Sequence, residues 1–258
     1  MKPAVLTVLL LALSIPSGRA VDPPALDVYA ELLSRYVTPA GVRYDCWRKE
    51  KRDVKALAGV VEQLSLVDAS RLAPVERRAH GINLYNATVL KLVVEGELKS
   101  SIRELSEDKK GLEIFDRPIL VVAGSPLSLN GLEKVLREEG RDPRVHFAIN
   151  CAARSCPPLQ RAPFRADALE IQLERAAREF LASKEAVTIE RDRVAINRIF
   201  EWYRDDFGPV GSVAAFIKSY APAGVFDTLK AAKFEDALTY REYDWSLNAD
   251  KASACQDS

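Results

Sequence analysis

The sequence has no excess of charge of either sign. It contains 37 Lys or Arg and 37 Asp or Glu residues in a chain of 258, and no segment of the sequence is densely basic. Proteins bind nucleic acids through clustered positive charge, so we expect no nucleic-acid partner. Hydrophobic residues make up 48% of the chain and charged residues 29%, a composition that excludes disordered, collagen-like and coiled-coil proteins and predicts a globular core.

Residues that bind metals and phosphates are scarce as well. His80 and His146 are the only histidines, and the four cysteines include no C-x-x-C pair. Zinc sites commonly use such pairs, so we predict no metal site. Gly124 follows an apolar stretch, but the lysine and the further glycines of a phosphate-binding loop are missing. We therefore expect no nucleotide or other cofactor.

Apolar runs long enough to span a membrane are missing too. The run over residues 5–13 is far shorter than the roughly 20 residues that a membrane-spanning helix needs. Lys2 precedes this run, and Gly18-Arg19-Ala20 follows it with small residues at the positions that signal peptidase reads. We therefore predict that residues 1–20 are a signal peptide, that the protein is exported to the periplasm or secreted, and that no membrane span remains after cleavage.

Export places the four cysteines in an oxidising compartment. Cys46, Cys151, Cys156 and Cys255 can pair there in three complete ways. The sequence does not choose among these pairings.

Hydrophobic periodicity predicts one α+β domain over residues 21–258. Apolar residues three and four apart mark helices, and the segment from Pro74 to Gly96 is apolar nearly all round in its second half, so this helix is expected to be central. We expect a single compact domain in which the central helix packs on a small, mostly antiparallel sheet. Helices are predicted at about residues 26–36, 54–64, 74–96, 130–140, 167–180, 213–220 and 226–234, and strands at 118–123, 145–150, 187–190, 193–197 and 238–245.

Two of these elements carry polar residues of interest. Asn130 and Glu133 fit a capping box at the start of a helix, in which each side chain satisfies a free backbone N–H. In the strand predicted over residues 145–150, His146 and Asn150 share the polar face.

Several long sequence motifs occur in a distinctive order along the chain, from about residue 80 to residue 207, and a further motif lies near the end. Through them the chain resembles family 547 of the domains of unknown function. The resemblance implies an exported bacterial protein with a fold similar to the papain and transglutaminase superfamily, but it implies no established biochemical role. This chain departs from the family at His80 and Gly81, where two aromatic residues are usual. The motifs are Ile82–Ala87, Ser128–Asn130, Asp142–Cys151, Ser155–Pro157, Trp202–Tyr203 and Tyr243–Asn248.

The residues around the predicted strand end suggest thiol catalysis. Cys151 or Cys156 would be the nucleophile and His146 the base, with Glu133 or Asn150 orienting the imidazole. An extended strand would place His146 about 16 Å from Cys151 on the opposite face, whereas residues 152–155 can reverse the chain and bring Cys156 back. The hypothesis is a thiol-dependent hydrolase or acyltransferase that acts on peptide or amide bonds.

The alternative hypothesis is a non-catalytic binding module of the cell envelope. A disulfide between Cys151 and Cys156 would shape its recognition loop and stabilise the fold by roughly 2 kcal/mol. In either case the partner is an unidentified peptide, protein or small molecule. Candidate substrate-binding residues are Asn83, Tyr85, Asn86, Ser128 and Trp202, although the two asparagines equally fit hydrogen bonding to backbone groups, and Trp202 fits a place in the core.

Overall fold

The computed structural model describes residues 24–107, 111–122, 124–190, 193–209, 212–222, 238–252 and 255. The predicted signal peptide and the helix expected over residues 226–234 lie outside these ranges.

Helices form most of the N-terminal half of the described chain. Helices α1 and α4 begin at prolines, which fit the first turn because their backbone nitrogen has no hydrogen to leave unpaired. The Glu76 carboxylate accepts a hydrogen bond from the backbone N–H of Ala73 at 3.0 Å and so satisfies a further group at the start of α4. Gly96 caps the end of α4, as predicted. The elements are α1 (Pro24–Tyr36), β1 (Val37–Thr38), β2 (Gly41–Val42), α2 (Tyr44–Lys49), α3 (Lys51–Ser65) and α4 (Pro74–Glu95).

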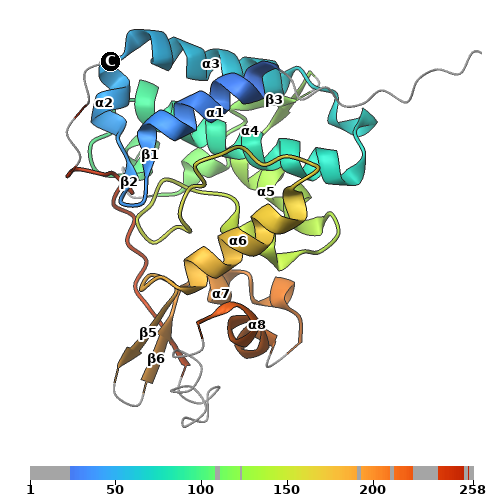
Figure 1. Ribbon diagram of the computed structural model, residues 1–258, viewed down its shortest axis with the longest axis vertical. Coiled ribbons are helices and arrows are strands. Elements are labelled where there is room, and N and C mark those ends of the chain that lie inside the picture. The colour runs from blue at the N-terminus through green and yellow to red at the C-terminus, as the bar shows by residue number, and fades with distance from the viewer. Residues whose placement is uncertain are drawn as a thin grey trace, which may run out of the picture.

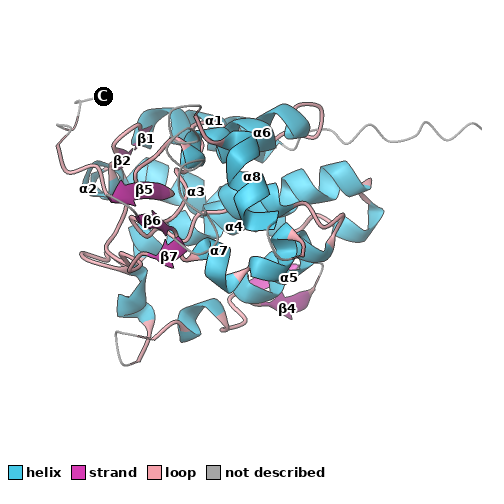
Figure 2. Cartoon of the chain, turned by 90° about the horizontal axis from the view of Figure 1, so that it is seen from below, coloured by secondary structure: helices cyan, strands magenta, loops and turns pink. Residues whose placement is uncertain are grey.

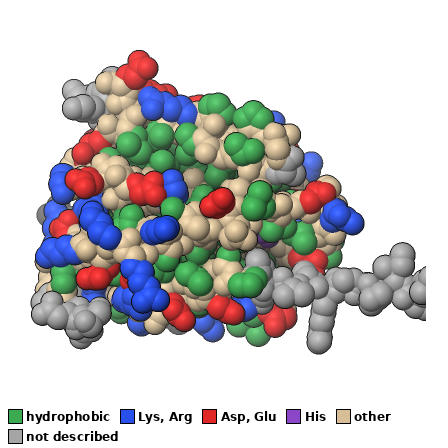
Figure 3. Space-filling model, turned by 90° about the horizontal axis from the view of Figure 1, so that it is seen from above, with side chains coloured by type: hydrophobic (Ala, Val, Ile, Leu, Met, Phe, Trp, Pro, Cys, Tyr) green, Lys and Arg blue, Asp and Glu red, His purple; other side chains and the backbone are tan. Residues whose placement is uncertain are grey.

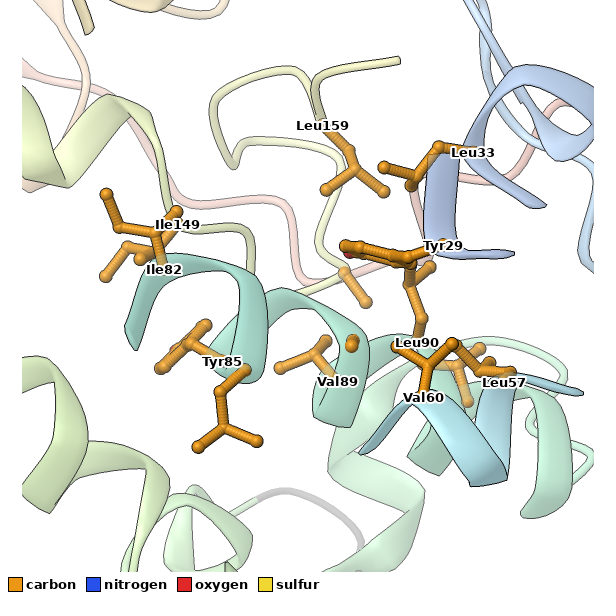
Figure 4. Close-up of a cluster of buried hydrophobic side chains, with 14 of the residues drawn as sticks. Tyr29, Leu33, Leu57, Val60, Ile82, Tyr85, Val89, Leu90, Ile149 and Leu159 are labelled. Atoms are coloured by element: carbon orange, nitrogen blue, oxygen red, sulfur yellow. The ribbon is translucent and has the colours of Figure 1, made fainter. Parts of the chain in front are cut away.

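Helix α4 is central, as its sequence predicts. Every residue from Gly81 to Leu90 is buried, including the polar side chains of Asn83 and Asn86. Its main neighbours are the helices α3 and α5 (Leu129–Glu138). Figure 4 shows part of the resulting core, in which Ile82, Tyr85, Val89 and Leu90 of α4 face side chains of α1 (Tyr29, Leu33), of α3 (Leu57, Val60) and of the loops (Ile149, Leu159).

The middle of the chain corrects several predictions. The stretch expected as a buried strand at 118–123 forms only the short strand β3 (Leu120–Val122), which pairs with β4 (Ser125–Leu127) in a hairpin, and Val121 is 55% exposed. A two-stranded hairpin at the surface packs against the protein with only one of its faces. Val121 is on the other face, which explains its exposure to solvent. The remaining short 3₁₀ turns lie at Ala69–Arg71, Ile102–Leu105 and Glu113–Phe115.

The predicted capping box at Asn130 is wrong. Ser128 is the residue that caps α5, because its hydroxyl accepts a hydrogen bond from the backbone N–H of Gly131 at 2.9 Å. Asn130 and Glu133 therefore lie inside the helix, and Asn130 donates instead to Asp116 at 2.7 Å. Glu133 is consequently free of the capping role that the sequence suggested.

The strand predicted over residues 145–150 is wrong as well. Residues Pro143–Phe147 form a 3₁₀ helix, which Asp142 caps by accepting a hydrogen bond from the backbone N–H of Arg144 at 3.0 Å. Pro143 fixes a φ angle that suits a helical turn, so the Asp-Pro pair starts a turn where the alternating apolar pattern indicated a strand.

The C-terminal part combines a second group of helices with a three-stranded sheet. The predicted hairpin is confirmed: β5 (Val187–Glu190) and β6 (Arg193–Ile196) are antiparallel, and β7 (Leu238–Tyr240) adds to β6 in parallel. Figure 2 shows these strands side by side, away from β4, which lies beside α5. The helices are α6 (Leu169–Leu181), α7 (Ile199–Trp202) and α8 (Ser212–Tyr220), with a 3₁₀ turn at Arg204–Phe207.

Helix α6 joins the two regions of hydrophobic packing. Leu169 and Leu173 belong to the core around α4, whereas Ala177 and Phe180 pack with Phe147 in the second cluster. In Figure 1, α6 lies between the helices α1–α5 and the lower region of β5, β6 and α8. The expected α+β class is therefore confirmed, with small sheets at the edges of a helical core.

The C-terminal segment returns to the N-terminal helices. The backbone of Val42 donates to Asn248 at 2.9 Å and accepts from Asp250 at 2.9 Å, and a disulfide joins Cys46 to Cys255. Among the described residues, no helix is both long and apolar enough to cross a membrane. Figure 3 shows basic and acidic side chains intermixed over one face of the molecule.

Candidate ligand pocket

A pocket of about 330 Å³ is lined by residues of α4, of α5, of α7 with Tyr203, and of the segments 112–115, 146–157 and 243–245. Aromatic rings dominate its wall, and two cysteines, one acid and one histidine complete the chemically active lining. The lining residues are Tyr85, Leu112, Phe115, Asn130, Glu133, His146, Ile149, Cys151, Cys156, Pro157, Ile199, Trp202, Tyr203, Tyr243 and Trp245.

Buried asparagines fix the loop that carries the cysteines. The Asn86 side chain donates to the carbonyl of Ala148 at 2.9 Å and accepts from the backbone N–H of Asn150 at 2.8 Å. Asn150 in turn donates to the carbonyl of Pro157 at 2.7 Å and accepts from Ala152 at 2.8 Å. These bonds hold both ends of the segment from Asn150 to Pro157 against α4.

Asn83 has the same kind of role one turn earlier on α4. Its side chain donates to the carbonyl of Phe164 at 2.7 Å and accepts from the N–H of the same residue at 2.8 Å. The amides of Asn83, Asn86 and Asn150 are thus occupied by backbone groups, the alternative that the sequence left open for the first two. None of the three lines the pocket, and neither does Ser128, the cap of α5.

Cys151 and Cys156 are joined by a disulfide across the loop, with their Cα atoms 6.3 Å apart. Their sulfur atoms lie 3.3 and 3.2 Å from the hydroxyl oxygen of Tyr243, and the backbone N–H of Cys151 donates to the sulfur of Cys156 at 3.0 Å. The extended strand that would have separated His146 from Cys151 does not form, and both residues line the same pocket. In this state neither sulfur is a thiol, so the pocket contains no cysteine nucleophile.

His146 pairs with an aspartate that the sequence analysis missed. Its Nε2 lies 2.7 Å from the Oδ2 of Asp206. Arg137 binds Asp206 through two bonds, at 2.6 and 3.1 Å. The hydrogen bond from His146, together with that from Arg137, holds the pKa of Asp206 well below its usual range.

Glu133 lies among tyrosines at the inner end of the lining. The residue is 7% exposed. Burial raises the pKa of Tyr85, Tyr203 and Tyr243 well above the ordinary value, and the charge of Glu133 raises it further in each case. These hydroxyls therefore stay protonated at neutral pH; that of Tyr243 donates to the sulfur of Cys156, and that of Tyr203 donates to Glu133.

The structure brings together six of the residues chosen from the sequence: Tyr85, Glu133, His146, Cys151, Cys156 and Trp202 all line the pocket. Sequence reasoning missed Tyr243 and Trp245 as lining residues. Both residues belong to the motif Tyr243–Asn248, and this motif is the sequence feature that could have indicated them. Among the described residues, no group of three or more His, Cys, Asp or Glu side chains could hold a metal ion.

Comparison with protein families identifies the segment that carries most of this chemistry. Residues 69–181 match the family model described as a protein of unknown function, DUF547. The resemblance indicated by the motifs is thus confirmed, and we call this part the DUF547 segment. It contains Glu133, His146 and the disulfide, whereas Trp202, Tyr203, Tyr243 and Trp245 complete the pocket from outside it.

Neither the curated proteins nor the solved structures contain a match to the chain. The implied similarity to the papain and transglutaminase superfamily therefore stays a prediction.

Proposed function

We propose that this protein is a non-catalytic binding module that holds a small ligand in the aromatic pocket. The observation that carries the proposal is the Cys151–Cys156 disulfide, which removes both candidate nucleophiles and makes them part of the pocket wall. A concave, mainly apolar site with a few fixed polar groups is the common form of a small-molecule site. The proposal favours the binding hypothesis over the enzyme hypothesis for the oxidised protein.

The construction of the site supports binding rather than turnover. The asparagine bonds and the disulfide hold the loop from Asn150 to Pro157 in one conformation before any ligand arrives. A preformed site loses less conformational freedom on binding, which strengthens affinity without further contacts.

A second candidate function is a thiol-dependent hydrolase or acyltransferase that acts only after reduction. It is favoured by the sulfur of Cys156, which accepts hydrogen bonds from the N–H of Cys151 and the hydroxyl of Tyr243. The same donors would stabilise a thiolate, and the His146–Asp206 pair would take its proton. An exported dithiol reductant would have to supply two electrons and two protons to open the disulfide.

We also propose that the protein works after export. The basic and apolar start of the sequence and the small residues before position 21 support this location. Two disulfides among the described residues are consistent with an oxidising compartment.

Three probes of similar shape and different charge test the binding function: benzyl alcohol, benzylamine and benzoate, titrated into the non-reduced protein and followed by ligand-observed NMR and thermal shift. We expect saturable binding of at least one probe, and at least about a tenfold loss of affinity in Trp202→Ala, because Trp202 is an exposed wall residue. Ile171→Ala is the matched control, since this exposed apolar residue on α6 lies outside the pocket. Absence of binding by all three probes, or equal binding by Trp202→Ala, would contradict the proposal.

The role of the disulfide is tested by two double variants. Cys151→Ser with Cys156→Ser should weaken probe binding, whereas Cys46→Ser with Cys255→Ser should leave it unchanged, because the latter pair does not line the pocket. Alkylation of the non-reduced protein, mapped by peptide mass spectrometry, separates the two candidate functions. Rapid modification of a free Cys156 would favour the thiol enzyme, and recovery of a linked Cys151–Cys156 peptide would favour the binding module.

A further inference from the structure

We propose that the ligand of this pocket is a small organic cation, held with its ammonium group among the aromatic rings and with the carboxylate of Glu133 as its counter-ion. The inference rests on the proposed binding function and names the chemical class of the ligand.

The aromatic rings form walls at an angle to one another. Trp202 and Tyr243 have ring centroids 4.8 Å apart and planes at 47°, and Tyr243 and Trp245 have centroids 4.7 Å apart and planes at 50°. Tyr203 adds a further ring, stacked on His146 at 4.2 Å. Rings in several orientations around one space present their negative faces to it, which is the arrangement that attracts alkylated ammonium groups.

The lining residues that the structure describes carry charge of one sign. Glu133 is the carboxylate among them, and this described set contains neither lysine nor arginine. A buried carboxylate needs a partner, because removal from water is costly for an unpaired charge. The nearest guanidinium described beside it, that of Arg137, is already bound through two bonds to Asp206. Tyr203 hydrogen-bonds Glu133 but carries no charge, so a cationic ligand would supply the counter-charge that the described lining does not.

Rings of the same wall already accept positive charge from outside the lining. The guanidinium of Arg137 lies 4.6 Å from the centroid of Tyr203, and that of Arg103 lies 5.8 Å from the centroid of Trp245. These contacts show that rings of this wall attract cations, although the faces that Arg137 and Arg103 cover are taken by the protein itself.

Choline and 3,3-dimethylbutan-1-ol test the inference, because the two molecules share size and shape and differ only in the charge of the central atom. We expect choline to bind the non-reduced protein at least about tenfold more tightly than the neutral alcohol, measured by tryptophan fluorescence of Trp202 and Trp245 and by calorimetry. Glu133→Gln should reduce this preference to about threefold or less. Glu138→Gln, an exposed change on the same helix, should leave it intact.

Each outcome decides a separate point. Equal binding of choline and the neutral alcohol would overturn the inference, while binding of benzyl alcohol would still uphold the proposed function. A choline preference that survives in a folded Glu133→Gln variant would overturn the role of Glu133, and the wild-type comparison does not depend on that variant. Glycerophosphocholine separates two sources of the cation: tighter binding than choline would assign a lipid headgroup, and weaker binding would assign a free cation.

Discussion

The two histidines of the chain have opposite surroundings. His146 has a carboxylate partner in Asp206, whereas the Nε2 atom of His80 is buried without a hydrogen-bond partner among the described residues. Burial lowers the pKa of His80 to about 4, because a charged imidazole would lose its hydration there. An uncharged ring therefore suits this place.

His80 should make the protein sensitive to mild acid. Its folded pKa lies below the unfolded value of about 6.5, so the unfolded state binds the proton more readily and stability falls as the pH drops from about 6.5 towards 4. At pH 4.5 this loss amounts to about 2 kcal/mol. His80→Phe should remove that share of the loss, measured as the difference between urea unfolding at pH 7 and at pH 4.5. An unchanged difference between the two pH values would contradict this account.

Asp206 should make the protein lose stability in acid as well, over a lower pH range than His80. Its pKa is lowered in the folded state, chiefly by the hydrogen bond from His146, so its contribution to stability is present above the unfolded value of about 4 and is lost as the pH falls through the folded pKa. Asp206→Asn should destabilise the protein at pH 7 by about 1–3 kcal/mol in urea unfolding. Asp205→Asn is the matched control, since the neighbouring side chain is exposed. Equal effects of the two variants would exclude the proposed role of the His146 and Arg137 bonds.

At the residue scale, the sequence indicates which residues are chemically reactive better than it indicates which residues they contact. Cys151, Cys156, His146 and Glu133 were recognised as reactive types, and all four line the pocket. The partner of His146 was missed because Asp206 is 60 residues away along the chain. The asparagines of α4 were ambiguous for the same reason: an amide on a buried helix face fits a ligand or a distant backbone group equally well, and only the fold brings Ala148 and Phe164 to it.

Among the helices, α4 and α5 approach each other closely at Gly81. A Cβ atom at Gly81 would lie 2.8 Å from a terminal methyl of Leu136 and 3.6 Å from Leu132, both on α5. A larger side chain at this position would displace the end of the Leu136 side chain or push the two helices apart.

Gly81→Val should therefore destabilise the protein by about 1–3 kcal/mol, because the added methyl groups overpack the α4–α5 contact. The comparison is Gly59→Val on α3, where a Cβ atom meets nothing within 4 Å. That variant should be neutral or stabilise by up to about 0.5 kcal/mol, since valine has a better helix propensity than glycine. Guanidinium unfolding of both variants gives the values, and a similar effect at the two sites would show that helix propensity alone governs them.

The period of the apolar pattern decided which elements the sequence could reveal. The helices α1, α3, α4 and α6 each show apolar residues three and four apart, and each was found. Helix α2 was missed because six residues are too few to show a period. At residues 145–150 the alternation imitated a strand, although all six residues are buried and the Asp142–Pro143 pair starts a turn. There, the capping residue Asp142 and the following proline determine the local structure, and the apolar alternation does not.

At the scale of the whole molecule, the return of the C-terminal segment could not be foreseen. Three pairings of the cysteines were open. The sequence patterns do not reveal that Cys255 lies next to α2, or that Tyr243 and Trp245 line the pocket. The bonds between Val42 and the segment 248–250 fix this return. The pocket lining thus joins residues as far apart in the sequence as Tyr85 and Trp245.

Removing the two disulfides should have different effects on stability and on binding. The Cys46–Cys255 bond has a sequence separation of 209 residues and Cys151–Cys156 one of 5. The loop-entropy relation gives stabilisations of about 5 and about 2 kcal/mol, respectively. Guanidinium unfolding should therefore show the larger loss for Cys46→Ser with Cys255→Ser, while benzyl alcohol binding should weaken only for Cys151→Ser with Cys156→Ser. The reverse order of stabilities would mean that the ends of the chain stay together in the unfolded state without the long-range bond, and weaker binding by both variants would mean that the pocket depends on the return of the C-terminal segment as a whole.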